Sequence, residues 1–145
     1  MILVTGGCGY IGSHTVKRLR AAGEDVLVVD NLAEGHREAL LGTPLLEGDL
    51  QDRRFVQDLF SRRGGIESVV HFAASCYVGV SMERPGEYYR QNVSAMLNLL
   101  EAMRDHGVER FVFSSSCATY GVPEQVPIVE ENPQDAALLE LALSS

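Results

Sequence analysis

A glycine-rich segment near the start of the chain constrains its fold more than any other feature. Residues 5–12 read Thr-Gly-Gly-Cys-Gly-Tyr-Ile-Gly, with the spacing Gly-x-x-Gly-x-x-Gly at positions 6, 9 and 12. An apolar run, Ile2-Leu3-Val4, precedes this segment, and a helical pattern follows it. A glycine turn between a strand and a helix is typical of the phosphate-binding loop of a βαβ unit.

Each glycine has a separate physical reason to be there. Gly6 allows a tight turn, Gly9 has no side chain to hold a pyrophosphate away from the backbone, and Gly12 lets the helix pack close to the strand. The start of the helix then offers N–H donors and a positive dipole end to phosphates. The alternative is a glycine-rich turn that binds nothing.

The rest of the chain alternates between short apolar runs and helical patterns. Runs this short and rich in β-branched residues are typical of strands buried on both faces. Alternating strands and helices predict a parallel sheet, and right-handed crossovers make it a doubly wound, Rossmann-like α/β fold with the strand order 3-2-1-4-5. The predicted strands lie near 2–4, 26–29, 45–46, 69–72 and 111–113, and the predicted helices cover 10–22, 52–63 and 86–106, with a weak helix between the second and third strands.

The chain has 145 residues, which suits one domain. Residues 1–122 are predicted to form a dinucleotide-binding domain. Residues 123–145 read as an acidic tail with several prolines, in which 136–143 fit one short helix. We therefore expect the chain to stop short of a separate substrate domain.

An aspartate ends the second apolar run. Asp30 lies 18 residues after Gly12, where a carboxylate can accept hydrogen bonds from an adenosine ribose and would repel a 2′-phosphate. No arginine follows directly, so the cofactor is predicted to be NAD rather than NADP. Asp49 and Leu50 end the third run, where they either flank the adenine or begin the next helix, with Asp49 as its N-cap.

Composition and charge exclude several classes of function. The net charge is −8 and no basic stripe is visible, so we expect no nucleic-acid partner. No apolar run approaches the ~20 residues of a membrane span. The first residues lack the basic segment with which a signal peptide begins, so we expect no signal peptide. The three cysteines are odd in number and widely spaced and form neither a disulfide framework nor a zinc pattern, which favours a reducing cytoplasm. The four histidines have no metal-site spacing either.

Six strings in order resemble the extended short-chain dehydrogenase/reductase family. They are VTGGCGYIGSHT (4–15), VVDNL (28–32), EGDLQD (47–52), VVHFAA (69–74), YYRQNV (88–93) and FVFSSSCATYG (111–121). The likeness runs from residue 2 to about residue 133. It is stronger to the family's nucleotide-sugar 4-epimerases than to its nucleotide-sugar dehydratases.

The resemblance implies a cofactor site and a chemistry. In these epimerases NAD takes a hydride from C4 of a UDP-hexose and returns it to the other face, while a tyrosine of a Tyr-x-x-x-Lys motif moves the hydroxyl proton. Ser116 matches the active-site hydroxyl of the family. The residues that match its cofactor contacts are Gly6, Gly9, Tyr10, Ile11, Gly12, Asp30, Asn31, Leu32, Asp49, Leu50, Phe72, Ala73, Ala74, Gln91 and Ser114.

The chain departs from the family in three places. Cys76 stands where many members have lysine, and Gln91 stands where asparagine is frequent. Lys17 is the only lysine, and Ser13 lies four residues before it, so these 145 residues contain no Tyr-x-x-x-Lys. We expect an NAD-binding fragment without turnover, which would take a UDP-hexose only if a further region were present. The alternatives are an active epimerase or dehydratase of the family and a fragment that binds no cofactor.

Three further features of the sequence concern association, the core and thiol reactivity. The stripe Val93, Met96, Leu97, Leu100 and Met103 predicts either core or a subunit interface, which favours a homo-oligomer. His71 is predicted to be a core histidine. Cys76 and Cys117 are either small apolar fillers or reactive thiols beside the cofactor.

Overall fold

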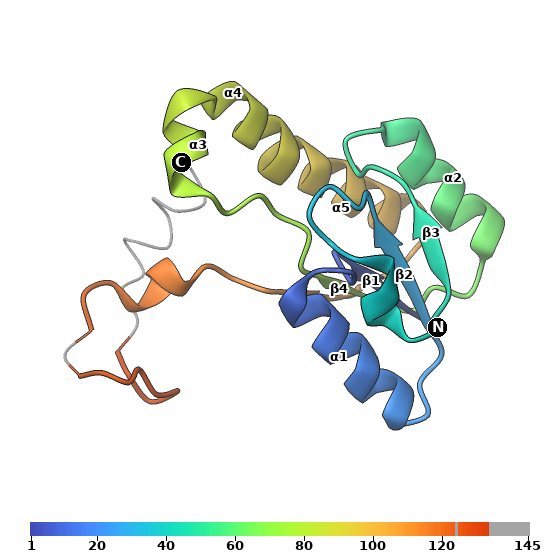
Figure 1. Ribbon diagram of the computed structural model, residues 1–145. Helices are drawn as coiled ribbons and strands as arrows, with labels where there is room; N and C mark the ends of the chain where they lie inside the picture. The colour runs from blue at the N-terminus through green and yellow to red at the C-terminus, as the bar shows by residue number, and fades with distance from the viewer. Residues whose placement is uncertain (124, 134–145) are drawn as a thin grey trace. The chain divides into compact units, whose positions relative to one another are not determined.

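The computed structural model describes residues 1–123 and 125–133 (Figure 1). The chain divides into two compact units, Met1–Phe113 and Ser114–Ser145. The first unit holds the sheet and its covering helices. The second contains a short 3₁₀ helix, η3 (Cys117–Tyr120), within its described part. The prediction of a domain over 1–122 with a separate tail stays a prediction, and the predicted helix at 136–143 lies outside the described residues.

Five parallel strands form the sheet of the first unit. In space they follow the order β3-β2-β1-β4-β5, which confirms the predicted topology. The register places Val4 of β1 beside Val28 of β2 and Val70 of β4. The strand bounds are β1 (Ile2–Thr5), β2 (Val26–Asp30), β3 (Leu45–Glu47), β4 (Ser68–His71) and β5 (Arg110–Phe113).

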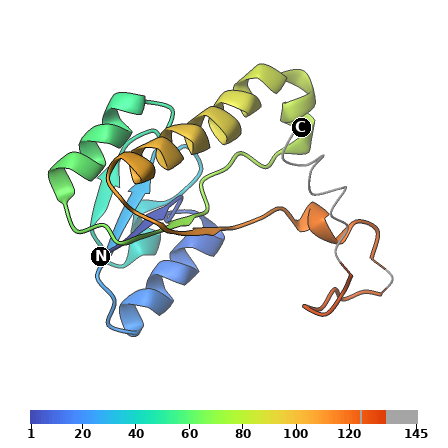
Figure 2. The ribbon, with the colours of Figure 1, turned by 180° about the vertical axis from the view of Figure 1, so that it is seen from behind.

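Two hydrophobic clusters bury the two faces of this sheet. Successive side chains of a strand point to opposite faces, so Leu3 and Val4 belong to different clusters. Val4 packs with Val16 of α1 (Tyr10–Ala21), whereas Leu3 packs with residues of α2 (Arg53–Arg63) and α5 (Ala95–Asp105). Figures 1 and 2 show α1 on one side of the sheet and α2 with α5 on the other.

The first two long helices begin and end as their sequences predict. Gly9 stands at the N-cap of α1, and Gly23 follows its end in a left-handed conformation (φ 86°). At the start of α2, the Asp52 carboxylate accepts hydrogen bonds from the backbone N–H groups of Arg54 and Phe55, at 2.9 and 3.2 Å. Asp52 is therefore the N-cap, and the alternative that gave this role to Asp49 is wrong.

The predicted helix over 86–106 is not one continuous α-helix. It consists of α4 (Pro85–Tyr88), a π-helical segment η2 (Tyr89–Ser94) and α5. The side chains of α5 that face the core are Ala95, Leu99, Ala102 and Met103. Val93, Leu97 and Leu100 of the predicted stripe are instead exposed, and only its last member, Met103, lies in the core.

Two short helices complete the first unit. The weak helix predicted between the second and third strands is the 3₁₀ helix η1 (Arg37–Leu40). A helix that the sequence did not predict, α3 (Val78–Glu83), follows the loop after β4. No helix in the described ranges is long and apolar enough to cross a membrane.

Candidate dinucleotide-binding site

The glycine turn after β1 is shaped by close backbone contacts. Gly6 has a positive φ of 71°, and a Cβ added to it would lie 2.5 Å from the backbone nitrogen of Ala73. A Cβ on Gly12 would collide with the carbonyl oxygen of Gly6. A Cβ on Gly9 would meet only that same oxygen, at 3.4 Å, so the other side of Gly9 is open. The turn is thus packed against backbone at Gly6 and Gly12 and open at Gly9.

The open side of the turn is the start of helix α1. An α-helix leaves its first N–H groups without partners inside the helix, and no side chain of the described residues caps α1 at Gly9. The side chains of Tyr10 and Ile11 point outward, with exposed fractions of 83% and 61%. The backbone here has the donors and the dipole end that an anionic group requires.

Asp30 closes the site at the end of β2. Its carboxylate is buried and accepts two backbone hydrogen bonds, from the N–H of Cys8 and from the N–H of Leu32, both at 2.9 Å. Leu32, which donates one of these bonds, has a left-handed backbone conformation (φ 56°). Each carboxylate oxygen has a second lone pair, so Asp30 can still accept a hydrogen bond from a ligand.

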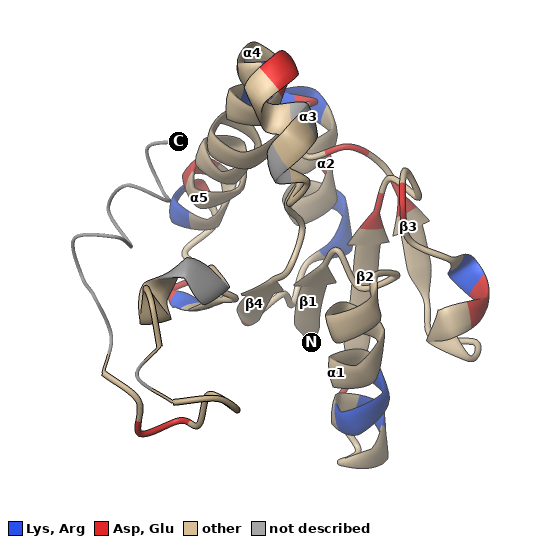
Figure 3. Cartoon of the chain, turned by 60° about the vertical axis from the view of Figure 1, so that its left-hand side comes forward, with Lys and Arg blue, Asp and Glu red and all other residues tan. Residues whose placement is uncertain are grey.

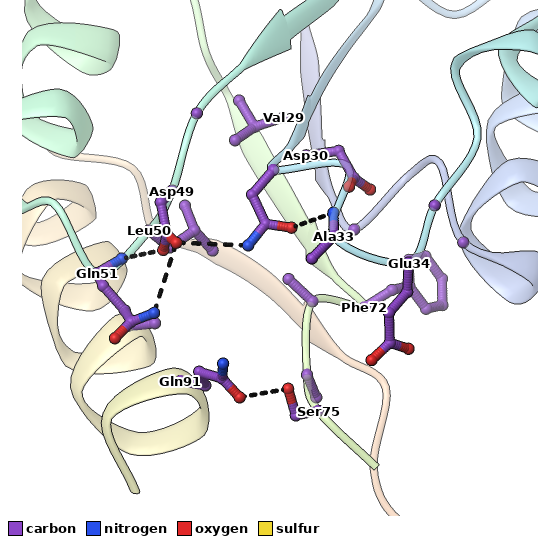
Figure 4. A pocket seen from close by; sticks show the side chains of 18 residues that line it. Val29, Asp30, Ala33, Glu34, Asp49, Leu50, Gln51, Phe72, Ser75 and Gln91 are labelled. Carbon is purple, nitrogen blue, oxygen red and sulfur yellow. Dashed lines mark hydrogen bonds between the residues drawn. The ribbon is translucent and has the colours of Figure 1, made fainter. Parts of the chain in front are cut away.

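A pocket of about 210 Å³ lies where these segments meet (Figure 4). It is lined from the glycine turn and from the segments that follow β2, β3 and β4, with two residues of η2 and α5. This is the carboxyl edge of a parallel sheet, where doubly wound folds bind their ligands. The predicted residues that line it are Gly6, Gly9, Asp30, Asn31, Asp49, Leu50, Phe72, Ala73, Ala74 and Gln91.

The other predicted site residues do not line this pocket. Gly12 packs beneath the turn, Tyr10 and Ile11 open helix α1, and Leu32 donates to Asp30. Ser114 and Ser116 belong to the second unit, where the Ser116 carbonyl accepts a hydrogen bond from the Thr119 N–H at 3.2 Å. The contact of each predicted residue with a cofactor, and a catalytic role for Ser116, stay predictions.

The segment after β4 is held by side chains that sequence reasoning missed. Asn92 accepts a hydrogen bond from the Ser75 N–H at 2.8 Å and donates to the Ser75 carbonyl at 3.0 Å. The Tyr88 hydroxyl accepts from the Tyr77 N–H at 3.0 Å and donates to the Tyr77 carbonyl at 2.8 Å. Both side chains come from the helix that follows in sequence. The signal available in the sequence was the string YYRQNV (88–93), which places Tyr88 four residues before Asn92.

The electrostatic character of the pocket is acidic. Its lining contributes the carboxylates of Asp30, Glu34 and Asp49, and among the described residues that line it none is Lys, Arg or His. Figure 3 shows acidic residues at the tips of β2 and β3. The Glu34 carboxylate also raises the pKa of the Tyr77 hydroxyl above its ordinary value. An anionic ligand here depends on backbone N–H groups rather than on cationic side chains.

The two described cysteines of the first unit differ in their surroundings. Cys8 is buried in the glycine turn, and burial together with the nearby Asp30 raises the pKa of its thiol to about 11, so the thiol stays neutral. Cys76 is exposed, so its interpretation as a small apolar filler is wrong. The side chain of Cys117 lies outside the described residues. No cluster of metal-ligating side chains occurs in the parts of the chain that the structure describes.

Fold and site together define a Rossmann-like dinucleotide-binding unit. Residues 2–138 match the NAD dependent epimerase/dehydratase family. The chain belongs to this family, which confirms the resemblance seen in its motifs.

Individual relatives are UDP-glucose 4-epimerases. The chain is 52% identical over 134 residues to the UDP-glucose 4-epimerase of Lacticaseibacillus casei, covering 92% of this chain and 40% of that protein. The crystal structure of UDP-glucose 4-epimerase from Brucella ovis in complex with NAD is 41% identical, with a TM-score of 0.81 over 99% of this chain and 45% of that one. The Bifidobacterium longum enzyme, in complex with NAD⁺ and UDP, is 34% identical, with a TM-score of 0.80 over 99% of this chain and 48% of that one.

These matches have a common extent. The chain spans about 40% of the length of the curated relative described above, and less than half of each solved chain. The shared part contains the sheet, the glycine turn and the pocket.

Proposed function

We propose that this chain binds NAD in the pocket at the carboxyl edge of its sheet. The observation that carries the proposal is that the open glycine turn and the Asp30 carboxylate line the same pocket. The N–H groups at the start of α1 would hold the pyrophosphate. Asp30 would accept hydrogen bonds from the adenosine ribose and would repel a 2′-phosphate. When bound, NAD supplies a hydride acceptor.

The relatives described above are UDP-glucose 4-epimerases, and we propose that these 145 residues alone lack that activity. They contain no Tyr-x-x-x-Lys, because Lys17 is the only lysine. General-base help is worth roughly 10²–10⁴-fold, and correct positioning of reactants up to ~7–11 kcal/mol. Without the tyrosine and lysine pair, Ser116 would have no partner in moving the C4 hydroxyl proton. A UDP-hexose would be bound only with the help of a further region.

We also propose that the chain forms a homo-oligomer. The outward side of η2 and α5 exposes the apolar side chains of Val93, Leu97 and Leu100, with exposed fractions of 37%, 55% and 38%. Apolar faces of this kind favour association. The cytoplasmic location expected from the cysteines stays a prediction.

Isothermal titration with NAD and with NADP tests the binding proposal. The wild-type chain should bind NAD more tightly than NADP. Asp30→Ala should weaken NAD and change NADP little, since it removes both the ribose acceptor and the repulsion. Asp58→Ala is the matched control, because Asp58 lies in α2 outside the pocket lining and pairs with Arg62. A wild type that prefers NADP, or binds neither, would overturn the proposal.

A coupled epimerase assay tests the proposal on turnover. Purified chain given NAD and UDP-galactose should yield no UDP-glucose above the blank, and Ser116→Ala should change nothing. Turnover that Ser116→Ala abolishes would show that another base serves, and would make the chain an active enzyme.

A further inference from the structure

We propose that Ser75 is a positioning residue of the pocket, whose hydroxyl orients the Gln91 amide so that the amide nitrogen faces the cavity. The Ser75 hydroxyl donates a hydrogen bond of 2.6 Å to Oε1 of Gln91. Both residues line the pocket. The proposal rests on the proposed binding of NAD and assigns a role to a residue outside the motifs of the sequence.

The Ser75 backbone is fixed independently of its hydroxyl. Asn92 bonds both the N–H and the carbonyl of Ser75, so one amide satisfies the backbone as a neighbouring strand would. Two residues further on, Tyr88 bonds both backbone groups of Tyr77. Tyr88 is itself buried. The Ser75 hydroxyl is therefore presented from a backbone that is held at two points.

Two neighbouring amides of one helical segment reach the same residue. Gln91 bonds the Ser75 hydroxyl, whereas Asn92 bonds the Ser75 backbone. Both lie in η2, and both bond Ser75. π-Helical turns occur frequently at functional sites.

The bond to Ser75 leaves one side of the Gln91 amide available. Oε1 accepts from Ser75, and Nε2 has no hydrogen-bond partner among the residues that the structure describes. Figure 4 shows this nitrogen on the cavity side of the amide. The carboxylates of Asp30, Glu34 and Asp49 favour the same orientation, because an amide N–H₂ is attracted to an acidic pocket and an amide oxygen is not.

The Gln91 amide differs in this respect from the other two amides of the lining. The Nδ2 of Asn31 and the Nε2 of Gln51 lie 3.4 and 3.5 Å from Oδ2 of Asp49 and donate to it. Gln91 is thus the side chain of the lining that keeps an unengaged N–H₂ for a ligand. The Gln91 N–H₂ group would donate to a phosphate or hydroxyl oxygen of the dinucleotide. The bond from Ser75 orients the amide for this contact before the ligand binds.

A double-mutant cycle in NAD titrations tests the inference. Ser75→Ala should weaken NAD binding about three- to tenfold, which is the range of one net hydrogen bond. Gln91→Leu should weaken it at least as much, and Ser75→Ala should cost nothing further in the Gln91→Leu background. Ser75→Thr keeps the hydroxyl and is the matched control, with near wild-type affinity.

A measurement without cofactor makes the two proposals separable. In the ¹⁵N spectrum of the free chain, the Gln91 side-chain N–H₂ resonances, assigned by their loss in Gln91→Leu, should shift in Ser75→Ala and hold their place in Ser75→Thr. Equal losses of NAD affinity from Ser75→Ala in both backgrounds, or no loss in either, would refute the role of Ser75 while leaving NAD binding intact. A wild type that binds no NAD would instead defeat the proposed function, and with it the ligand assigned to Gln91.

Discussion

Acidification should destabilise this fold through one buried histidine. His71 ends β4 with 2% of its surface exposed, and its Nδ1 lies 2.6 Å from the Thr5 hydroxyl. Its ring also lies near the rings of Phe111 and Phe113, with centroids 6.1 and 6.0 Å away. Burial among these groups lowers the pKa of His71 to about 4, from an ordinary value of 6.5.

The lowered pKa fixes the sign and size of the effect. Between pH 6.5 and pH 4 the unfolded chain binds a proton at His71 that the folded chain refuses, so stability falls as the pH falls. At 1.36 kcal/mol for each pKa unit, the full effect is ~3 kcal/mol. By pH 5 the loss is ~2 kcal/mol relative to pH 8.

Urea unfolding followed by circular dichroism at pH 8 and pH 5 measures this loss. Carboxylates also titrate in this range, so the comparison is with His71→Gln, which retains a partner for Thr5 but takes up no proton. The variant should lose ~2 kcal/mol less than wild type between the two pH values. His36→Gln removes an exposed imidazole and should follow the wild-type curve. Equal losses in wild type and His71→Gln would refute the reasoning.

Three other changes probe the turn, a helix cap and the exposed apolar face. Gly6→Ala should cost more stability than Gly23→Ala by about 1–3 kcal/mol, the range of a steric overlap. Both glycines have positive φ, but only at Gly6 would a Cβ meet Ala73, so equal costs would contradict the close approach. Asp52→Ala should lower the free energy of unfolding by about 1 kcal/mol, and no change would argue against the cap. Leu97→Glu should shift the chain toward monomer in sedimentation velocity, whereas an unchanged distribution would place the interface elsewhere.

The sequence alone determined the sheet and the central part of the site. The strand positions follow from short apolar runs in the sequence. The strand order follows because the connection between two parallel strands is right-handed. The glycines at 6 and 12 could be interpreted from sequence because a positive φ or a close backbone contact restricts the residue type at one position. Asp30 could be placed because it directly ends a strand.

Only the tertiary structure decided how the side of the pocket formed by Ser75 and Gln91 is built. The bonds of Ser75 with Gln91 and Asn92 join residues 16 and 17 positions apart, and the apolar pattern records neither these bonds nor the π-helical segment that holds both amides. Within α5, Leu97 is exposed and Leu99 is buried in the core. Periodicity reports which residues share one side of a regular helix, and α5 offers apolar residues on two sides. Packing against α2 decides which side is buried, and the partners of Ser75 are known only once the segment after β4 lies beside η2.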